Sequence, residues 1–395
     1  MREQFLPFSP PLVGDEEVAG VVDSIRSGWL TTGPRVATFQ SRFAEYIGAR
    51  DALALNSCTA ALHVALKVLG IGPGDAVVST PMTFTSSIHV IEHVGARPIL
   101  VDVEPDTLNI DPSAIEKAIA DANGAVKAIL PVHLYGHPCD MRPILATAKR
   151  IGAAVVDDAA HSFPASYDGR LIGAAEPADS GVRRLTAFSF YATKNLTTGE
   201  GGMLTGDPDL IDQSRIWSLH GMSRDAYKRY TAEGSWFYEV VAPGFKYNMP
   251  DLQAAIGIAQ MDRLDAMQAR RKAIYDRYDA ALGALEEVET PTIRPNVDAA
   301  RHIYPLRLNL ERLQVDRARF IQLLGEMNIG SSVHFIPVHL HPYYRDRYGF
   351  QPEDFPVAYR EYQRLVSLPL NPTMTDADVD DVVEAVTAIA AGNRR

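Results

Sequence analysis

Short apolar runs alternate with helix-like patterns through the first half of the chain. The runs that we interpret as buried strands cover residues 52–55, 76–79, 98–103, 128–132, 153–157, 185–190 and 202–205. Between them, apolar residues recur every three to four positions, which is typical of amphipathic helices. Because buried strands that alternate with helices build a mainly parallel sheet covered on both faces, the pattern predicts an α/β fold.

Helical patterns also flank this region. Before it, Val18, Val21, Val22 and Ile25 lie at helical spacing, and residues 36–47 repeat the pattern. After it, residues 251–282 predict one long helix, which is followed by shorter strand-like and helix-like segments. We therefore expect a large domain over residues 1–250. A bridging helix and a smaller α+β domain should fill residues 251–395.

The composition narrows the class of protein. The 395 residues include 38 Lys and Arg against 49 Asp and Glu, and the net charge of −11 disfavours a general binder of nucleic acid or of anionic membranes. No apolar run approaches the roughly 18 residues of a membrane-spanning helix, and the first residues lack the apolar core of a signal peptide. The two cysteines form no CxxC pair. We therefore expect a cytoplasmic protein without a disulfide framework.

A loop between two predicted strands carries one lysine, Lys194. Ser189 precedes it by five residues, and glycines follow at positions 199, 201 and 202. A lysine held on a short loop between packed strands can lose part of its hydration, which lowers its pKa and lets its amine attack a carbonyl. We therefore predict that Lys194 forms a Schiff base with pyridoxal 5'-phosphate (PLP). The alternative is an ordinary surface lysine on a turn.

The turn at residues 56–61 joins a predicted strand to a predicted helix. The free amides and the dipole of a helix start favour an anion such as phosphate, and Thr59 adds a hydroxyl. Ser189 could bind the same phosphate. Taken alone, simple capping of the helix by Ser57 or Thr59 is the favoured interpretation.

Polar and aromatic residues follow two further strands. Asp158 lies where a carboxylate could keep the pyridine nitrogen of a cofactor protonated, and His161 could reach the phenolic oxygen. Phe84 lies where its ring could stack on a flat cofactor. The alternatives are a turn-capping Asp, a solvated histidine and a core aromatic. Because all these residues follow strands of one sheet, their convergence with Lys194 favours a PLP site.

Two groups are candidates for substrate contacts. Arg224 and Arg229 form a basic cluster with Lys228 that suits a diphosphate, although a solvated loop is equally favoured. His334 and His339 lie in an aromatic, polar segment that could line a sugar site. Their spacing offers no convincing zinc ligand set, so we predict no metal.

Together these segments resemble the DegT/DnrJ/EryC1/StrS family of PLP-dependent sugar aminotransferases. The resemblance runs from about Phe5 to the C-terminus and rests on residues 27–34, 56–61, 158–161, 189–194 and 244–251. It implies the PLP-dependent transferase fold type I and an obligate homodimer with shared active sites. It also implies that Thr59, Ala60 and Ser189 bind the phosphate with Asn248 of the other subunit. We expect Trp29 and Thr31 to contact the substrate.

Within the family the chain is most similar to ArnB-type enzymes, which act in lipid A modification. These enzymes transfer an amino group from L-glutamate to a UDP-linked 4-keto pentose and form UDP-4-amino-4-deoxy-L-arabinose. The similarity lies in residues 5–9, 27–34, 244–248 and 367–370. Alternative acceptors are a UDP-4-keto-6-deoxy-N-acetylhexosamine or a dTDP- or GDP-linked 4-keto-6-deoxyhexose, for another polysaccharide or a secondary metabolite. Lys194 disfavours the sugar-dehydrating branch, which has histidine there. Together with Thr59, Asp158 and Ser189, it also disfavours a catalytically silent regulator.

Overall fold

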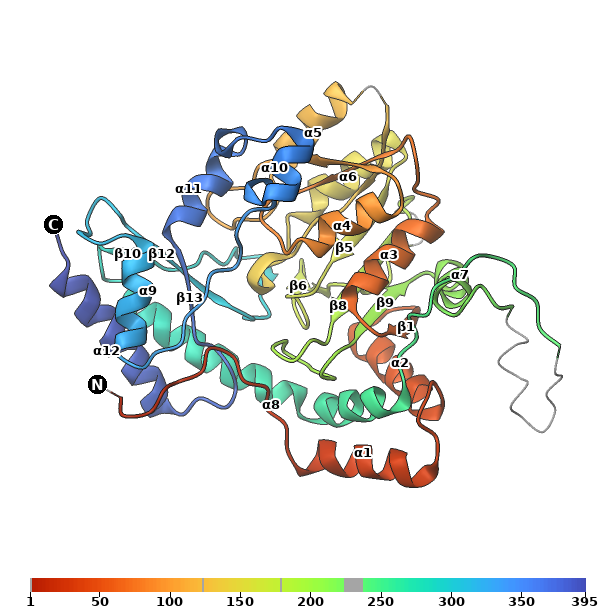
Figure 1. Ribbon diagram of the computed structural model, residues 1–395, viewed down its shortest axis with the longest axis horizontal. Coiled ribbons are helices and arrows are strands. Elements are labelled where there is room, and N and C mark those ends of the chain that lie inside the picture. Colours follow the sequence, from red (N-terminus) through yellow and green to blue (C-terminus); the bar gives the residue numbers. More distant parts are fainter. Residues whose placement is uncertain (1, 123, 178–179, 224–236) are drawn as a thin grey trace.

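The computed structural model describes residues 2–122, 124–177, 180–223 and 237–395 (Figure 1). A seven-stranded sheet forms its centre, in the order β1-β9-β8-β5-β4-β2-β3. The strands are β1 (Asp51–Leu55), β2 (Ala76–Ser79), β3 (Arg97–Leu100), β4 (Val126–Ile129), β5 (Ala154–Asp158), β8 (Arg184–Ser189) and β9 (Gly202–Gly206). β9 runs antiparallel to β1 and to β8, and the other strand pairs are parallel, so the predicted, mainly parallel sheet is confirmed.

Helices connect and cover these strands, as the alternating pattern predicts. They are α2 (Pro34–Ile47), α3 (Cys58–Val68), α4 (Ser86–His93), α5 (Pro112–Asp121), α6 (Met141–Ile151) and α7 (Pro208–Ser218). The face of α2 that carries Val36, Phe39, Phe43 and Ile47 is buried, as expected from its spacing. Phe43 packs edge-on against Phe188 of β8, with ring centroids 5.1 Å apart. This packing fixes the helix on the strand that leads to Lys194.

The C-terminal part follows α8 (Asp251–Leu282), the predicted long helix. It contains a three-stranded antiparallel sheet of β10 (Val288–Glu289), β12 (Tyr304–Leu308) and β13 (Leu365–Leu368). Its helices are α9 (Arg317–Glu326), α10 (Pro342–Tyr348), α11 (Pro356–Arg364) and α12 (Asp376–Gly392). A second small sheet joins β11 (Val297–Asp298) to β6 (Ser166–Tyr167) and β7 (Arg170–Leu171), and so ties the two parts together.

The N-terminal segment packs on the C-terminal part of the chain. The Leu6 amide donates to Asn328, and the Leu6 carbonyl accepts from Gly330. Arg2 forms ion pairs of 2.6 and 2.7 Å with Asp378 and Asp381 of α12. The first residues therefore span the two parts, and the division at residue 250 remains a prediction.

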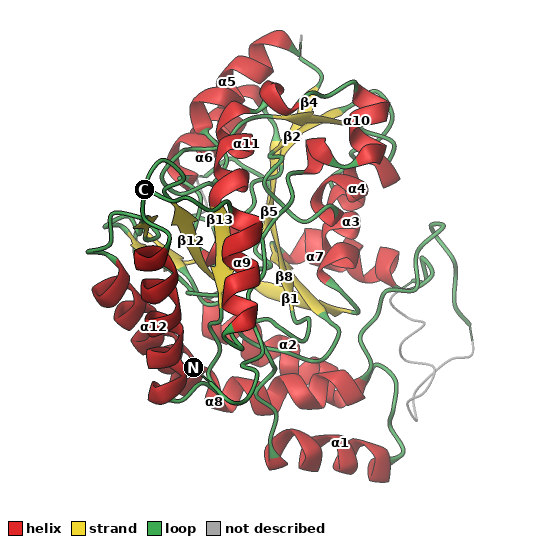
Figure 2. Ribbon diagram, turned by 60° about the vertical axis from the view of Figure 1, so that its left-hand side comes forward, coloured by secondary structure: helices red, strands yellow, loops and turns green. Residues whose placement is uncertain are grey.

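The first helix, α1 (Asp15–Ser27), lies along α8 on the side away from the sheet (Figures 1 and 2). The helical spacing of its apolar residues predicts a buried stripe, but most of these residues are not buried. Val18, Val22 and Ile25 are exposed, whereas Glu17 and Ser24 are buried. Glu17 accepts a hydrogen bond from Gln260 of α8 at 2.7 Å and pairs with Arg263. The apolar stripe of α1 therefore faces outward.

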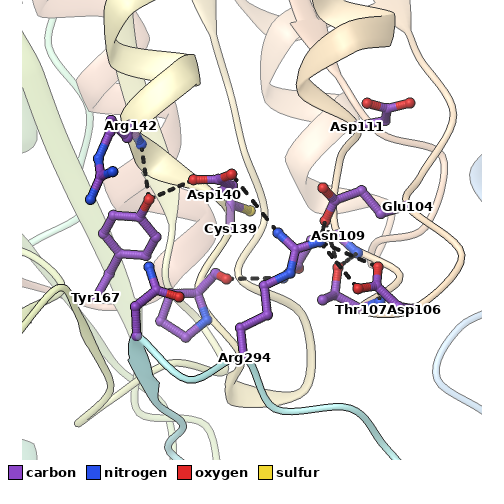
Figure 3. Close-up of polar contacts among 12 residues, drawn as sticks. Glu104, Asp106, Thr107, Asn109, Asp111, Cys139, Asp140, Arg142, Tyr167 and Arg294 are labelled. Carbon is purple, nitrogen blue, oxygen red and sulfur yellow. Dashed lines mark hydrogen bonds and ion pairs between the residues drawn. The ribbon is translucent and has the colours of Figure 1, made fainter.

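Arg294 connects the segment after β10 to the large sheet (Figure 3). Its guanidinium lies 2.9 Å from the carboxylate of Glu104 and 3.2 Å from that of Asp106. Its backbone amide donates to His137 Nε2 at 3.2 Å. His137 is buried and directly follows η1 (Leu134–Gly136). No helix in the described residues is long and apolar enough to cross a membrane.

Candidate active site

A cavity of about 500 Å³ lies at the carboxyl ends of the parallel strands. Its walls bring together seven of the residues that the sequence predicts for the site: Thr59, Phe84, Asp158, His161, Ser189, Lys194 and His334. They come from separate strand ends, from the start of α3 and from the segment between α9 and α10. The carboxyl edge of the sheet is where ligands of open α/β folds bind.

The N-terminus of α3 forms one wall of the cavity. The Ser57 hydroxyl accepts from the Ala60 amide at 3.0 Å, so Ser57 caps the helix, and Thr59 points to the cavity beside it. Gly202 lies directly behind this turn. A Cβ on Gly202 would come within 2.5 Å of the Ser57 carbonyl carbon and 2.6 Å of the Cys58 nitrogen. The turn and strand β9 therefore fit together only with glycine at this position.

Strand β5 presents two adjacent aspartates to different surroundings, because side chains alternate along a strand. Asp158 Oδ2 accepts from Ser87 Oγ at 2.6 Å, and Oδ1 accepts from the Ala160 amide at 3.0 Å. These two donors orient the carboxylate beside the cavity. Asp157 instead accepts from Arg184 and Thr186 of β8, away from the cavity.

Lys194 follows β8 and faces the cavity. Burial lowers the pKa of Lys194 to about 8, although the nearby Asp158 carboxylate opposes this effect. The unprotonated amine is therefore far more populated near neutral pH than in an exposed lysine, although the protonated form still predominates at pH 7. The predicted nucleophilic lysine has the environment that such chemistry needs.

His161 lies on the same wall with a defined hydrogen-bond pattern. Its Nδ1 accepts from the Tyr135 amide at 3.2 Å, so a neutral ring carries its proton on Nε2. Burial and the nearby Lys194 hold the pKa of His161 well below its usual value. A neutral imidazole with Nε2–H can donate a hydrogen bond to an oxygen in the cavity.

Aromatic rings complete the walls. Phe84 is 61 % exposed and lies at the cavity, so its ring is free to stack on a ligand. Phe335 lies 6.0 Å from the Phe84 ring and stacks on His161 at 5.6 Å. Phe8 stacks on His334 at 5.3 Å.

Ser189 lies at the end of β8, and its hydroxyl accepts a hydrogen bond from the Tyr191 amide at 3.4 Å.

Four predicted site residues do not line the cavity. One of them lies in the first turn of α3, and the other three lie close to one another. Ala60 contributes its amide to the α3 cap. Asn248 donates to Thr32 Oγ1 at 2.7 Å, and the Thr31 carbonyl accepts from the Asp251 amide. Trp29 Nε1 donates to the Thr32 carbonyl at 3.1 Å. Trp29, Thr31 and Asn248 therefore form one surface cluster outside the cavity of their own chain, which we call the Trp29 cluster.

The remaining predicted contacts are not part of the cavity. His339 is 1 % exposed and packs against Phe355, with ring centroids 4.8 Å apart. The expectation that His339 lines the sugar site is corrected on this point, because the ring faces the interior and not the cavity. Arg224 and Arg229 lie outside the described residues.

Several residues of the cavity were not anticipated from the sequence. Phe8, Ser9, His302 and Phe335 all line it, and Ser87 orients Asp158. They come from the N-terminal segment, from α4, from the residues just before β12 and from the segment between α9 and α10. Phe8 and Ser9 belong to a segment that resembles the pentose branch, and Ser87 is a hydroxyl at the start of a predicted helix, but neither feature places these residues at the cavity. No local pattern marks His302 or Phe335.

The donor set of the cavity fits PLP. The helix N-terminus with Thr59 and Ser189 suits a phosphate, and the oriented Asp158 carboxylate suits a protonated pyridine nitrogen. The exposed Phe84 ring suits a flat ring system, and His161 Nε2–H suits a phenolic oxygen. Lys194 suits the aldehyde. Each group of the cofactor thus has a matching side chain.

Comparisons with known proteins agree with this geometry. The model of the DegT/DnrJ/EryC1/StrS aminotransferase family matches residues 11–387. The chain is 50 % identical over 99 % of its length to the spore coat polysaccharide biosynthesis protein SpsC of Bacillus subtilis, of which it covers 98 %. It is 47 % identical over its full length to the uncharacterized protein MJ1066 of Methanocaldococcus jannaschii, which it also covers fully.

Solved structures also support membership in this aminotransferase family. Spr1654 of Streptococcus pneumoniae, assigned as a sugar aminotransferase, superposes in its PMP form with a TM-score of 0.90 at 35 % identity, over 98 % of this chain and 99 % of that one. Its PLP form superposes with a TM-score of 0.88. The narrower similarity to ArnB-type enzymes is not shown by these relatives. The chain belongs to the DegT/DnrJ/EryC1/StrS family and is a PLP-dependent sugar aminotransferase.

Proposed function

We propose that the enzyme transfers the amino group of L-glutamate to a nucleotide-linked 4-keto sugar, and that this sugar is a UDP-linked 4-keto pentose. One observation carries the choice of sugar. Two of the segments that resemble the pentose branch, residues 5–9 and 367–370, meet at His334 in the cavity. Phe8 stacks on the His334 ring, and Ser367 Oγ lies 2.9 Å from its Nδ1. The same N-terminal segment reaches the lysine loop through Ser9 Oγ, which lies 3.4 Å from the Thr193 carbonyl.

The chain's own residues would divide the chemistry between them. Bound PLP supplies an electrophilic carbon and a ring that accepts electrons from the substrate α-carbon. Lys194 Nζ would hold the cofactor and would act as the base and acid that takes the proton from the substrate α-carbon and returns it. Asp158 keeps the pyridine nitrogen protonated, and His161 donates to the phenolic oxygen. Thr59, the α3 amides and Ser189 hold the phosphate, and Phe84 stacks on the ring.

The substrates need further groups. Lys194 is the only Lys or Arg among the described residues that line the cavity, so it cannot also neutralise a diphosphate. We assign the diphosphate to Arg224 and Arg229. We assign the sugar to His334, which is held neutral because burial lowers its pKa to about 4. A neutral imidazole suits the hydroxyl groups of a sugar.

We further propose a homodimer in which each site receives residues from the partner. Two observations support this. The Trp29 cluster, including Asn248, lies outside the cavity of its own chain although the family resemblance places it at the cofactor and substrate. The outward stripe of α1, formed by Val18, Val22 and Ile25, offers apolar surface that water does not favour.

We also propose that the reaction takes place in the cytoplasm and supplies an amino sugar to a larger product. Cys58 and Cys139 are both free and buried, which suits the reducing cytoplasm predicted from the sequence. SpsC takes part in spore coat polysaccharide biosynthesis, as its name states. An amino sugar for a polysaccharide or for lipid A is the product class that we propose.

A panel of acceptors tests the choice of sugar. Purified enzyme would be incubated with L-glutamate and, separately, with UDP-4-keto pentose, UDP-4-keto-6-deoxy-N-acetylhexosamine, and dTDP- and GDP-4-keto-6-deoxyhexoses. Formation of 2-oxoglutarate and of the amino sugar would be measured by mass spectrometry, with the Lys194→Ala variant as the blank. We expect the highest kcat/KM with the pentose. Turnover with a hexose alone would contradict the pentose assignment and leave the aminotransferase assignment intact.

A further inference from the structure

Asn195 follows Lys194 directly and is almost fully buried, at 5 % exposure. Its side chain makes three hydrogen bonds. Nδ2 lies 3.0 Å from the Phe163 carbonyl and 2.8 Å from the Ala300 carbonyl, and Oδ1 lies 3.0 Å from His302 Nδ1. These bonds join the lysine loop to two segments that are distant in the sequence.

The pattern fixes which atoms are donors. Carbonyl oxygens only accept, so both N–H groups of the Asn195 amide are used by Phe163 and Ala300. Asn195 Oδ1 can only accept, so His302 Nδ1 must carry the proton. A neutral His302 ring therefore has an unprotonated Nε2, and its backbone amide is held by the Tyr135 carbonyl at 3.1 Å.

His302 lines the same cavity as Lys194 and His161. The rings of His161 and His302 lie 4.6 Å apart, and the two have opposite tautomers. Tyr135 forces the proton of His161 to Nε2, whereas Asn195 forces the proton of His302 to Nδ1. The cavity thus receives one imidazole that donates and one that accepts.

We propose that Asn195 and His302 form a positioning pair for Lys194, in which Asn195 clamps the lysine loop and holds His302 as a neutral hydrogen-bond acceptor towards Lys194 Nζ. This inference rests on the proposed role of Lys194 in proton transfer. Burial and the nearby Lys194 also hold the pKa of His302 well below its usual value. The acceptor is therefore available throughout the neutral pH range.

The tautomer can be measured without any reaction. Selective 15N-histidine labelling would give the shifts of both ring nitrogens, and the His302 signal would be identified by its absence in His302→Phe. We expect a proton on Nδ1 in the wild type. We expect exchange between both tautomers in Asn195→Ala. A wild-type proton on Nε2 would overturn the proposal, whatever the variants do.

Kinetics test the effect on Lys194. The glutamate half-reaction would be followed by the absorbance of the cofactor for Asn195→Ala, His302→Phe and the double variant. We expect each single change to lower its rate constant about 10- to 100-fold with little change in glutamate affinity, since small misplacements of a reacting group are costly. Because the residues act through one another, the double variant should be no slower than the slower single variant. Multiplied effects, or rate constants within twofold of the wild type, would overturn the proposal.

One further variant separates the explanations. Asn371→Ala removes another buried asparagine, whose Oδ1 bonds Thr373 in the C-terminal part, and should leave the half-reaction unchanged. If Asn195→Ala does not fold, His302→Phe serves alone, because it leaves both bonds from Asn195 Nδ2 to the Phe163 and Ala300 carbonyls in place. A wild-type rate constant in His302→Phe would overturn the proposal. The half-reaction contains no sugar, so failure of the pentose assignment does not affect it. Full activity of Lys194→Ala would instead refute the role of Lys194.

Discussion

Asp157 and Asp158 are neighbours in β5, yet their carboxylates serve opposite faces of the sheet. Asp158 accepts from Ser87 beside the cavity, whereas Asp157 is fully buried and pairs with Arg184 at 2.5 Å. His133 Nε2 lies 3.4 Å from the other Asp157 oxygen. Strand β5 thus directs the Asp158 carboxylate towards the cavity and the Asp157 carboxylate into a buried ion pair.

Substitution of each aspartate by asparagine should separate these roles. Asp158→Asn keeps the shape but loses the charge that the pyridine nitrogen needs, so kcat should fall at least about 100-fold with little change in melting temperature. Asp157→Asn removes the carboxylate that pairs with Arg184 at 2.5 Å and leaves the buried guanidinium paired with Glu176 alone, so it should destabilise the fold by about 1–3 kcal/mol. Steady-state assays and denaturant unfolding of both variants would measure this. Similar losses of stability in both would contradict the separation.

Asp157 also predicts how stability depends on pH. Burial alone would raise its pKa, but Arg184 and His133 outweigh burial and hold the pKa of Asp157 well below its usual value. A carboxyl whose folded pKa is depressed contributes stability above its unfolded pKa of about 3.9 and loses it as pH falls towards the folded value. The free energy of unfolding should therefore drop below about pH 4 more steeply in the wild type than in Asp157→Asn. Parallel curves for the two proteins would show that Asp157 does not carry the effect.

Lys194 predicts a pH dependence for cofactor uptake. Burial lowers its pKa to about 8, so the fraction of free amine rises as pH passes through this value. The rate at which the apoenzyme takes up PLP should increase with a midpoint near pH 8. Asp158 raises the pKa of Lys194, so Asp158→Asn should move the midpoint to lower pH. Stopped-flow absorbance from pH 6 to 10 would give both midpoints, and a shift to higher pH in the variant would be the wrong sign.

Gly202 predicts a steric effect on the phosphate turn. Alanine at this position would bring its Cβ within 2.5–2.6 Å of Ser57 and Cys58, so the turn must move. We expect weaker PLP binding and a loss of about 1–3 kcal/mol in stability, as for overpacked positions. Gly325→Ala in α9 is the matched control, because its Cβ would meet nothing within 4 Å. Fluorescence titration of both apoenzymes with PLP would compare the dissociation constants.

Most of the sheet and much of the cavity could be predicted from the sequence. The reason is physical: parallel strands end at one edge, so polar residues that follow apolar runs converge there. Thr59, Asp158 and Lys194 each follow such a run. His302 and Phe335 could not be found in this way, because they enter from segments far along the chain. Their positions depend on tertiary contacts, such as the bond between Asn195 and His302.

The helix α1 shows a different limit of sequence patterns. Spacing identifies an apolar stripe, but it does not say what covers that stripe. Here α8 contacts the other face of α1, because Glu17 on that face accepts a hydrogen bond from Gln260 and forms an ion pair with Arg263. The buried side chains of α1 are polar, and its apolar stripe stays exposed in the single chain.

That stripe provides a test of the proposed dimer. Val22 and Ile25 are 36 % and 57 % exposed in the single chain, so Val22→Glu with Ile25→Glu should change the stability of an isolated chain little. In a dimer that buries the stripe, two added carboxylates would lose hydration, and the dimer should dissociate. Sedimentation velocity should then show a monomer, with low transaminase activity because the Trp29 cluster no longer reaches the other site. Arg312→Glu, at a side chain 57 % exposed, changes the net charge by the same amount and should remain dimeric and active. A double variant that stays dimeric would place the subunit interface elsewhere.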